Sequence, residues 1–188
     1  MEISHQFGVL RKIKDSDLEL MLSWRNAPAV RENMYTTHEI SLTEHLSWWE
    51  RTRDSADQSY FMYEFQDQPL GIVGFTELDR VNQNSSWAFY ASPKAPKGIG
   101  SRMELLALDY AFYELKLHKL CCEVLAFNTP VIKLHKKFGF KIEGILRHQR
   151  RRDGKFFDVY RLGLLEGEWS GERDGMIFKL SRIYKGST

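Results

Sequence analysis

The stretch KGIGS, residues 97–101, has the glycine spacing of a turn that could bind phosphate. It follows a candidate strand and precedes an apolar stretch typical of a helix. The first N–H groups of a helix lack partners within it and lie at the positive end of its dipole, and glycine lets an anion approach the backbone. No Walker-type Gly-Lys-Ser/Thr follows, and Met103 stands where a dinucleotide-binding loop has its third glycine. The turn alone is equally consistent with phosphate binding and with a tight connection.

A carboxylate, Glu123, interrupts an apolar candidate strand over residues 119–125. It alternates with Cys121 and Leu125, which a sheet buries on at least one face. A carboxylate in that setting is paired, lies at an exposed edge or has a function. Of these, we expect a function.

The surrounding elements predict one domain of mixed α and β structure, with no repeat or linker dividing the chain. Hydrophobic periodicity predicts helices after two capping boxes, Ser16–Glu19 and Ser41–Glu44, after Gly100, and before Gly139. Turn signals at residues 66–69 and at Asp153-Gly154 predict two hairpins. The tail after Trp169 is polar and is assigned no element. Strands are predicted over residues 9–13, 60–65, 70–78, 87–91, 119–125, 142–149 and 156–164.

Two segments with a strand between them resemble the coenzyme-binding segments of the Gcn5-related N-acetyltransferase (GNAT) superfamily: KGIG at 97–100 and NTPVIKLHKKFGF at 128–140. The predicted order of elements is similar too, so the resemblance covers nearly the whole chain. It implies a single-domain α/β (α+β) fold, with a mixed, mostly antiparallel sheet of about seven strands flanked by about four helices. The acetyltransferase domain would span residues 1–166, and residues 167–188 would be a C-terminal extension that docks on the domain or follows it.

The resemblance also implies acetyl-CoA as co-substrate. The sequence has no CxxC and no clustered His/Cys pattern, so we expect no metal. In the superfamily the loop after the fourth strand binds the coenzyme pyrophosphate, and the asparagine and helix after the fifth strand flank the pantetheine arm. Superfamily loops often have Gln or Arg three residues before the first glycine, where this chain has Ala95, so we expect backbone amides to carry the binding. The coenzyme-binding residues implied are Phe89, Tyr90, Ala91, Lys97, Gly98, Ile99, Gly100, Ser101, Asn128 and Lys133.

Acetyl transfer to an amine needs donors for a developing oxyanion and a proton for the departing thiolate. The strand at Phe89–Ala91 could supply the donors. Where the superfamily commonly has a tyrosine as general acid, this chain has His135, and imidazole titrates near neutrality. Packing beside Leu134 and Phe138 is the alternative role. Glu123 could accept a proton from the substrate ammonium through water, so Glu123 and His135 are the candidate catalytic residues.

The segment WRNAPAVRENMYTTHEISLTEHLSWW, residues 24–49, resembles the acetyltransferases of the bacterial pseudaminic-acid pathway. Those enzymes acetylate the 4-amino group of UDP-4-amino-4,6-dideoxy-N-acetyl-β-L-altrosamine. An arginine offers a bidentate fork to phosphate, and methionine offers an adaptable apolar surface. Simple packing, or an ion pair for the arginine at a helix end, remains the alternative. The substrate-binding residues implied are Arg25, Met34, His45, Thr76 and Tyr90.

The C-terminal half, residues 144–169, looks like that of the ribosomal-protein N-terminal alanine acetyltransferases. Acetylation of protein N-terminal alanine or serine is therefore an alternative activity, and a non-catalytic acyl-CoA-binding or RNA-associated module is a second. Arg147 and residues 150–152 form a basic cluster. It is either a solvated hairpin or a contact for coenzyme phosphates, UDP or an acidic protein.

Composition and charge indicate which classes of partner are compatible with this chain. The 27 basic and 25 acidic residues leave a net charge of +2, which does not favour nucleic acid. No stretch approaches the roughly 20 apolar residues of a membrane span, and the N-terminus has no secretory signal pattern. The only cysteines, Cys121 and Cys122, are adjacent and point to opposite faces of a strand, which disfavours a disulfide. We expect a cytoplasmic enzyme with a UDP-amino-sugar substrate and without membrane or nucleic-acid partners. A homodimer is compatible with these features.

Overall fold

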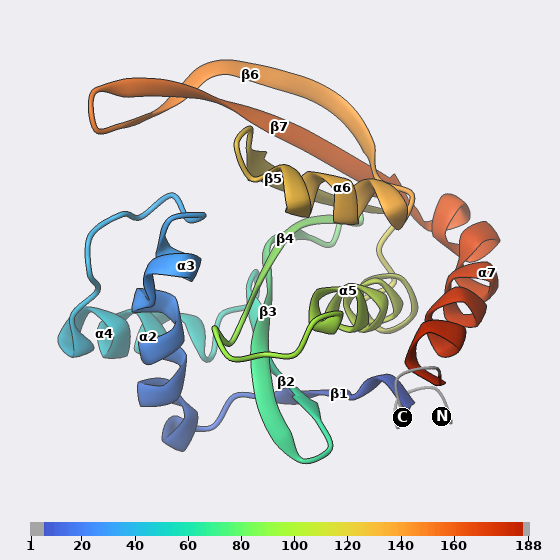
Figure 1. Cartoon of the computed structure of the whole chain (residues 1–188), viewed down its shortest axis with the longest axis horizontal. Helices are drawn as coiled ribbons and strands as arrows, with labels where there is room; N and C mark the ends of the chain where they lie inside the picture. Colours follow the sequence, from blue (N-terminus) through green and yellow to red (C-terminus); the bar gives the residue numbers. More distant parts are fainter. Residues whose placement is uncertain (1–5, 186–188) are drawn as a thin grey trace.

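The computed structural model describes residues 6–185, which form a seven-stranded sheet with helices on both faces (Figure 1). The strand order is β1-β2-β3-β4-β5-β7-β6, and all neighbours are antiparallel except β4 and β5. The strands are β1 (Val9–Lys12), β2 (Ser59–Phe65), β3 (Gln68–Asp79), β4 (Asn84–Ala91), β5 (Lys119–Leu125), β6 (Lys141–Arg152) and β7 (Lys155–Leu165). The helices are α2 (Leu18–Asn26), α3 (Pro28–Arg31), α4 (Leu42–Thr52), α5 (Ile99–Asp109), α6 (Thr129–Lys137) and α7 (Glu166–Lys185). The predicted α/β fold with a mostly antiparallel sheet is confirmed, and α3 and α7 are helices beyond the four expected.

The strands β4 and β5 run parallel and part after a short contact. Their ladder runs only from Asn84 paired with Lys119 to Ser86 paired with Cys121. Beyond it, β4 stays paired with β3 as far as Ala91, and β5 follows β7. The facing edges of both strands therefore carry backbone N–H and C=O groups that the sheet does not use.

Successive side chains of the central strands point to opposite faces of the sheet, so the core has a part on each face. Met62 on β2 and Ile72 on β3 pack with α2 and α4 residues such as Trp24. Their neighbours Phe61 and Val73 pack on the other face, with the apolar side chains of α5 and α7. This is the period of two expected for a sheet covered on both sides.

The start of the α2 region differs from the prediction. A 3₁₀ turn over Asp15–Asp17 precedes α2, and no side-chain cap is formed by Ser16. Instead, the carboxylate of Asp17 accepts the N–H of Lys14 at 2.7 Å and is held by Arg11 at 2.6 and 2.9 Å. The capping box predicted at Ser16 is therefore wrong, because an arginine-anchored carboxylate satisfies the free backbone donor.

Two other local signals are confirmed. The hydroxyl of Ser41 accepts the N–H of Glu44 at 3.2 Å, which caps α4 as the S-x-x-E pattern predicts. Asp153 and Gly154 both adopt left-handed backbone conformations, with φ of 49° and 78°, in the tight turn between β6 and β7. Both arms of this hairpin are longer than predicted.

The tail that was assigned no element forms α7, which packs against α5. Trp169 is fully buried, and its indole donates to Asp109 at 3.0 Å. Arg173 adds two hydrogen bonds to the same carboxylate at 2.8 Å each, while Met176 and Leu180 join the core. Although α7 spans 20 residues, neither it nor any other described helix is long and apolar enough to cross a membrane.

Candidate active site

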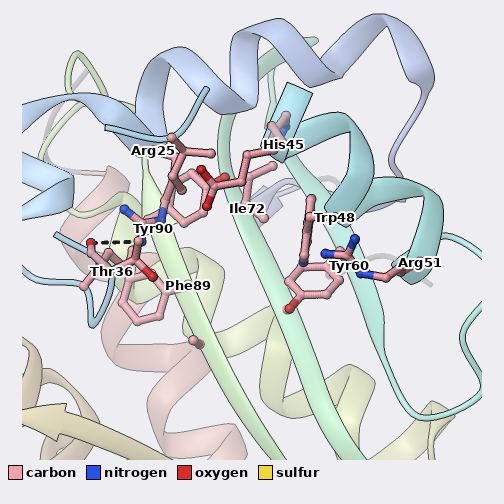
Figure 2. Close-up of a pocket in the computed structure, with 14 residues that line it drawn as sticks. Arg25, Thr36, His45, Trp48, Arg51, Tyr60, Ile72, Phe89 and Tyr90 are labelled. Atoms are coloured by element: carbon pink, nitrogen blue, oxygen red, sulfur yellow. Dashed lines mark hydrogen bonds between the residues drawn. The ribbon is translucent and has the colours of Figure 1, made fainter. Parts of the chain in front are cut away.

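Two adjoining cavities flank β4. The strand cleft, about 400 Å³, lies between the parted ends of β4 and β5 and the first turns of α6. The helix pocket, about 380 Å³, lies between the sheet and helices α2 and α4 (Figure 2). Four residues line both cavities: Met34, Ala88, Phe89 and Tyr90. A molecule in one cavity is therefore adjacent to a molecule in the other.

Of the predicted coenzyme-binding residues, four line the strand cleft: Phe89, Tyr90, Ala91 and Asn128. The first three lie on the part of β4 that β5 has left, so one backbone edge of this segment is free of the sheet. Such an edge offers N–H and C=O groups to the amides of a pantetheine arm, and apolar walls surround it. These residues fit the acyl arm of acetyl-CoA. Within residues 6–185 no cluster of three or more His, Cys, Asp or Glu side chains is placed to hold a metal ion.

The glycine turn lies at the N-terminus of α5 and does not line the strand cleft. Gly98 precedes the helix with φ of 91°, a conformation that favours glycine. Ile99 is buried in the core, and a Cβ on Gly100 would lie 3.2 Å from the Leu134 side chain of α6. Gly100 thus serves close packing between α5 and α6. The other predicted members of this group, Lys97, Ser101 and Lys133, also lie outside the cleft lining.

The sequence left open whether His135 borders the reaction site or packs in the core, and the structure shows both contacts. It lines the strand cleft, and it also packs among aromatic rings of Trp87, Phe89 and Phe140. Its Nδ1 lies 2.8 Å from Oε1 of Glu104, a fully buried carboxylate on α5. Glu104 was not predicted as a site residue, although it is the one charged residue in the apolar stretch MELLAL, residues 103–108.

Glu123 faces the strand cleft and has partners there. Its side chain is 32% exposed, and Oε2 accepts the Tyr35 hydroxyl at 2.7 Å. Arg161 Nη1 lies 3.7 Å from Oε1. Burial and the neighbouring carboxylate raise the pKa of Tyr35, so its hydroxyl remains a donor at neutral pH. The carboxylate is therefore paired and also borders the cavity, and Tyr35 is a cleft residue that the sequence analysis missed.

Arg25 lies in the helix pocket and forms no ion pair with a described residue, although Glu44 lines the same pocket. Nη2 makes a long 3.4 Å hydrogen bond to the Thr36 carbonyl (Figure 2), and Nη1 is buried with no hydrogen-bond partner. No carboxylate among the described residues forms an ion pair with it, which removes the helix-end ion pair as its role. Burial lowers the pKa of Arg25.

The other predicted acceptor residues divide into two groups. Met34, His45 and Tyr90 line the helix pocket with Arg25, whereas Thr76 lies on β3 beside Ser86 and lines neither cavity. The remaining wall residues, which the sequence analysis did not assign to the site, include Thr36, Ile40, Glu44, Trp48, Arg51 and Tyr60.

Aromatic stacking fixes one wall of the helix pocket. The His45 imidazole is stacked on Trp48 at 5.3 Å, and Trp48 meets Tyr60 edge-on at 5.0 Å (Figure 2). His45 is 5% exposed, and burial lowers its pKa, so the ring is neutral at neutral pH. Its buried Nε2 has no hydrogen-bond partner among the described residues.

The basic cluster on the β6–β7 hairpin holds the segment between α3 and α4. The hairpin reaches over this segment (Figure 1). Met34 of the segment lines both cavities. Arg152 donates to the carbonyls of Glu32 and Met34, the latter at 2.7 Å, and the Arg150 guanidinium lies 3.7 Å from the centre of the Tyr35 ring. These two arginines are thus not simply solvated, because they fix a wall of the site.

Comparison with known proteins agrees with this geometry. A family profile described as "Acetyltransferase (GNAT) domain" matches residues 9–141. A spermidine N(1)-acetyltransferase of Escherichia coli is 24% identical over 164 residues, covering 87% of this chain and 88% of the relative. Acetyltransferase PseH of Campylobacter jejuni is 27% identical over 131 residues, covering 70% of this chain and 81% of the relative.

The fold itself is found in solved structures. A crystal structure of spermidine N-acetyltransferase from Vibrio cholerae, in complex with CoA and spermine, matches with a TM-score of 0.82 at 23% identity. The match covers 88% of this chain and 99% of that chain. The family profile covers most of the sheet and of the strand cleft, and the chain therefore belongs to the GNAT acetyltransferase family. It is an acetyl-CoA-dependent N-acetyltransferase.

Proposed function

We propose that the acceptor is a UDP-linked 4-amino sugar, UDP-4-amino-4,6-dideoxy-N-acetyl-β-L-altrosamine, acetylated in pseudaminic acid biosynthesis. The observation that carries this proposal is the buried, unpartnered Nη1 of Arg25 in the helix pocket. A buried guanidinium nitrogen without a hydrogen-bond partner is destabilising, and an entering anion compensates for that loss of hydration. A diphosphate matches the planar fork of arginine.

The charges around the cavities favour an anion over a polyamine. Arg25 and Arg51 line the helix pocket, and neither forms an ion pair with a described residue. Of the two glutamates that line the cavities, Glu123 lies 3.7 Å from Arg161 and accepts the Tyr35 hydroxyl, and Glu44 lies 3.1 Å from His38. The helix pocket thus offers two guanidinium groups against one carboxylate, Glu44, which favours an anionic acceptor over a polycationic one.

Proton movements can be assigned to residues of the cleft. Acetyl-CoA supplies the acetyl group as a thioester. During transfer a C–N bond forms and the C–S bond breaks, so the amine loses a proton and the sulfur gains one. Glu123 would take the amine proton through water, and His135 would protonate the sulfur. Backbone N–H groups of Phe89–Ala91, on the free edge of β4, would stabilise the charge on the carbonyl oxygen.

Binding of UDP alone tests the acceptor class. We expect calorimetry to show saturable binding of UDP to the wild-type protein without acetyl-CoA, and no saturable binding of spermidine. A protein N-terminal acetyltransferase should not bind UDP. Absence of UDP binding, together with acetylation of a peptide beginning with alanine or serine, would replace this proposal with the protein N-terminal activity.

A further inference from the structure

A carboxylate and an imidazole form a buried pair behind the strand cleft. Glu104 on α5 is 0% exposed and His135 on α6 is 3% exposed, and Oε1 and Nδ1 lie 2.8 Å apart. Rings of Trp87, Phe89 and Phe140 surround the imidazole at centroid distances of 5.2 to 6.0 Å. A fully buried glutamate is rare unless it has a partner or a role that offsets its lost hydration.

The pair leaves one nitrogen of the imidazole available to the cleft. With Glu104 ionised, its carboxylate only accepts hydrogen bonds, so Nδ1 would donate the proton that the two groups share. The other nitrogen, Nε2, makes no hydrogen bond with any residue of the described chain. His135 lines the strand cleft, whereas Glu104 is not among its lining residues. The imidazole therefore lies between the carboxylate and the cavity.

The charge on Glu104 depends on His135. Burial raises the pKa of the Glu104 carboxyl, and the nearby imidazole is the main influence that opposes this rise, with a smaller contribution from Lys137. Oε2 of the carboxylate has no hydrogen-bond partner among the described residues. A protonated imidazole is thus the group in the structure best placed to balance a negative charge on Glu104.

We propose that Glu104 is a positioning residue for His135, which holds Nδ1, directs Nε2 toward the strand cleft and stabilises the imidazolium that protonates the departing thiolate. In this step the sulfur keeps the electron pair of the broken C–S bond and takes the proton from Nε2. The imidazole becomes neutral and keeps its hydrogen bond to Glu104, and it regains a proton from solvent. The inference rests on the proposed acetyl transfer, but it does not depend on which amine accepts the acetyl group.

Two substitutions and a matched control separate positioning from packing. Glu104→Gln keeps the shape and an acceptor for Nδ1 but removes the charge, and Glu104→Leu removes both. Asp109→Asn makes the same carboxylate-to-amide change on α5, at a hydrogen-bonded carboxylate that contacts α7 and not the cleft. Nitrogen-15 NMR of the free proteins reports which imidazole nitrogen carries the proton. Steady-state kinetics with an amine that the wild type acetylates gives kcat and the KM for acetyl-CoA.

We expect wild type and Glu104→Gln to show a hydrogen-bonded proton on Nδ1, and Glu104→Leu to lose that signal. Both Glu104 variants should lose kcat by about 10-fold or more, because general acid catalysis typically contributes at least that much, while the KM for acetyl-CoA changes by less than about twofold. Asp109→Asn should keep the kcat of the wild type.

Folded Glu104 variants with the kcat of the wild type would overturn the inference, as would a wild-type imidazole protonated on Nε2 alone. If Glu104→Leu does not fold, the near-isosteric Glu104→Gln decides the kinetic outcome. The NMR measurement needs no acceptor. A wild type that acetylates none of the amines therefore counts against the proposed function, while the Nδ1 signal still decides whether Glu104 orients the ring.

Discussion

Replacing Arg25 with methionine should weaken nucleotide binding without destabilising the free protein. In the free protein, the guanidinium has one buried nitrogen without a partner, one long hydrogen bond of 3.4 Å to Thr36, and no ion pair with a described residue. Methionine has a similar reach and no charge to desolvate. The substitution therefore removes little that stabilises the fold and removes the cation that would meet the ligand.

Arg25→Met should leave the stability of the free protein unchanged or higher, and it should lower the affinity for UDP. Relief of a buried, unpartnered polar group is worth about 1 kcal/mol or more, so the free energy of unfolding should stay level or rise by about 1 kcal/mol. Loss of hydrogen bonds between a guanidinium and a phosphate removes about 1.5–3 kcal/mol of binding, which is about 10- to 150-fold in the dissociation constant of UDP.

Urea unfolding and calorimetric titration with UDP measure the two quantities on the same protein. Arg53→Met is the matched control, because Arg53 lies at the end of α4 with carboxylate neighbours and does not line the helix pocket. It should leave the UDP affinity unchanged. An Arg25→Met protein that binds UDP as the wild type does, and unfolds more easily by about 2 kcal/mol, would show that this guanidinium is structural and would refute the reasoning.

Three further changes test other parts of the site. Gly98→Val places a branched residue at φ of 91°, which is strained by about 1–3 kcal/mol and should displace the first turn of α5; wild-type affinity for acetyl-CoA in equilibrium dialysis would remove this turn from the coenzyme site. Asp109→Asn weakens the charged hydrogen bonds to Arg173 and should lower the free energy of unfolding in urea by about 1–2 kcal/mol; an unchanged value would mean that apolar packing alone holds α7. Arg152→Ala frees the Met34 carbonyl and should raise the KM for the acceptor about fivefold, corresponding to roughly 1 kcal/mol, with a smaller effect on the KM for acetyl-CoA; equal effects on both constants would contradict a role specific to the acceptor side.

Local signals predicted most of the fold because they act between residues close in sequence. The cap at Ser41 and the turn signals at residues 66–69 and at Asp153-Gly154 all identified their elements. The segment that became α7 was missed because its buried residues, including Trp169, are widely spaced among polar and charged ones. The division of the chain at residue 166 stays a prediction, as do a homodimer and a cytoplasmic location.

The candidate site was less predictable because its contacts join distant segments. Glu104 meets His135 31 residues away, Tyr35 meets Glu123 88 residues away, and Arg152 reaches back 118 residues to Met34. No periodicity or spacing rule reports such pairs. The family resemblance predicted which residues line the cleft. Their hydrogen-bond partners, which fix the orientation of the side chains, could be identified only from the folded structure.

We propose an anionic, nucleotide-linked amine as the acceptor of this acetyltransferase. The most direct measurement is the ratio of kcat/KM for UDP-4-amino-4,6-dideoxy-N-acetyl-β-L-altrosamine to kcat/KM for spermidine, from acetyl-CoA-dependent release of CoA with one preparation of the wild-type protein. The unpaired guanidinium groups of the helix pocket predict a ratio well above one, of about 100 or more if two charged hydrogen bonds distinguish the acceptors. A ratio below one would contradict the account and assign the pocket to a polyamine.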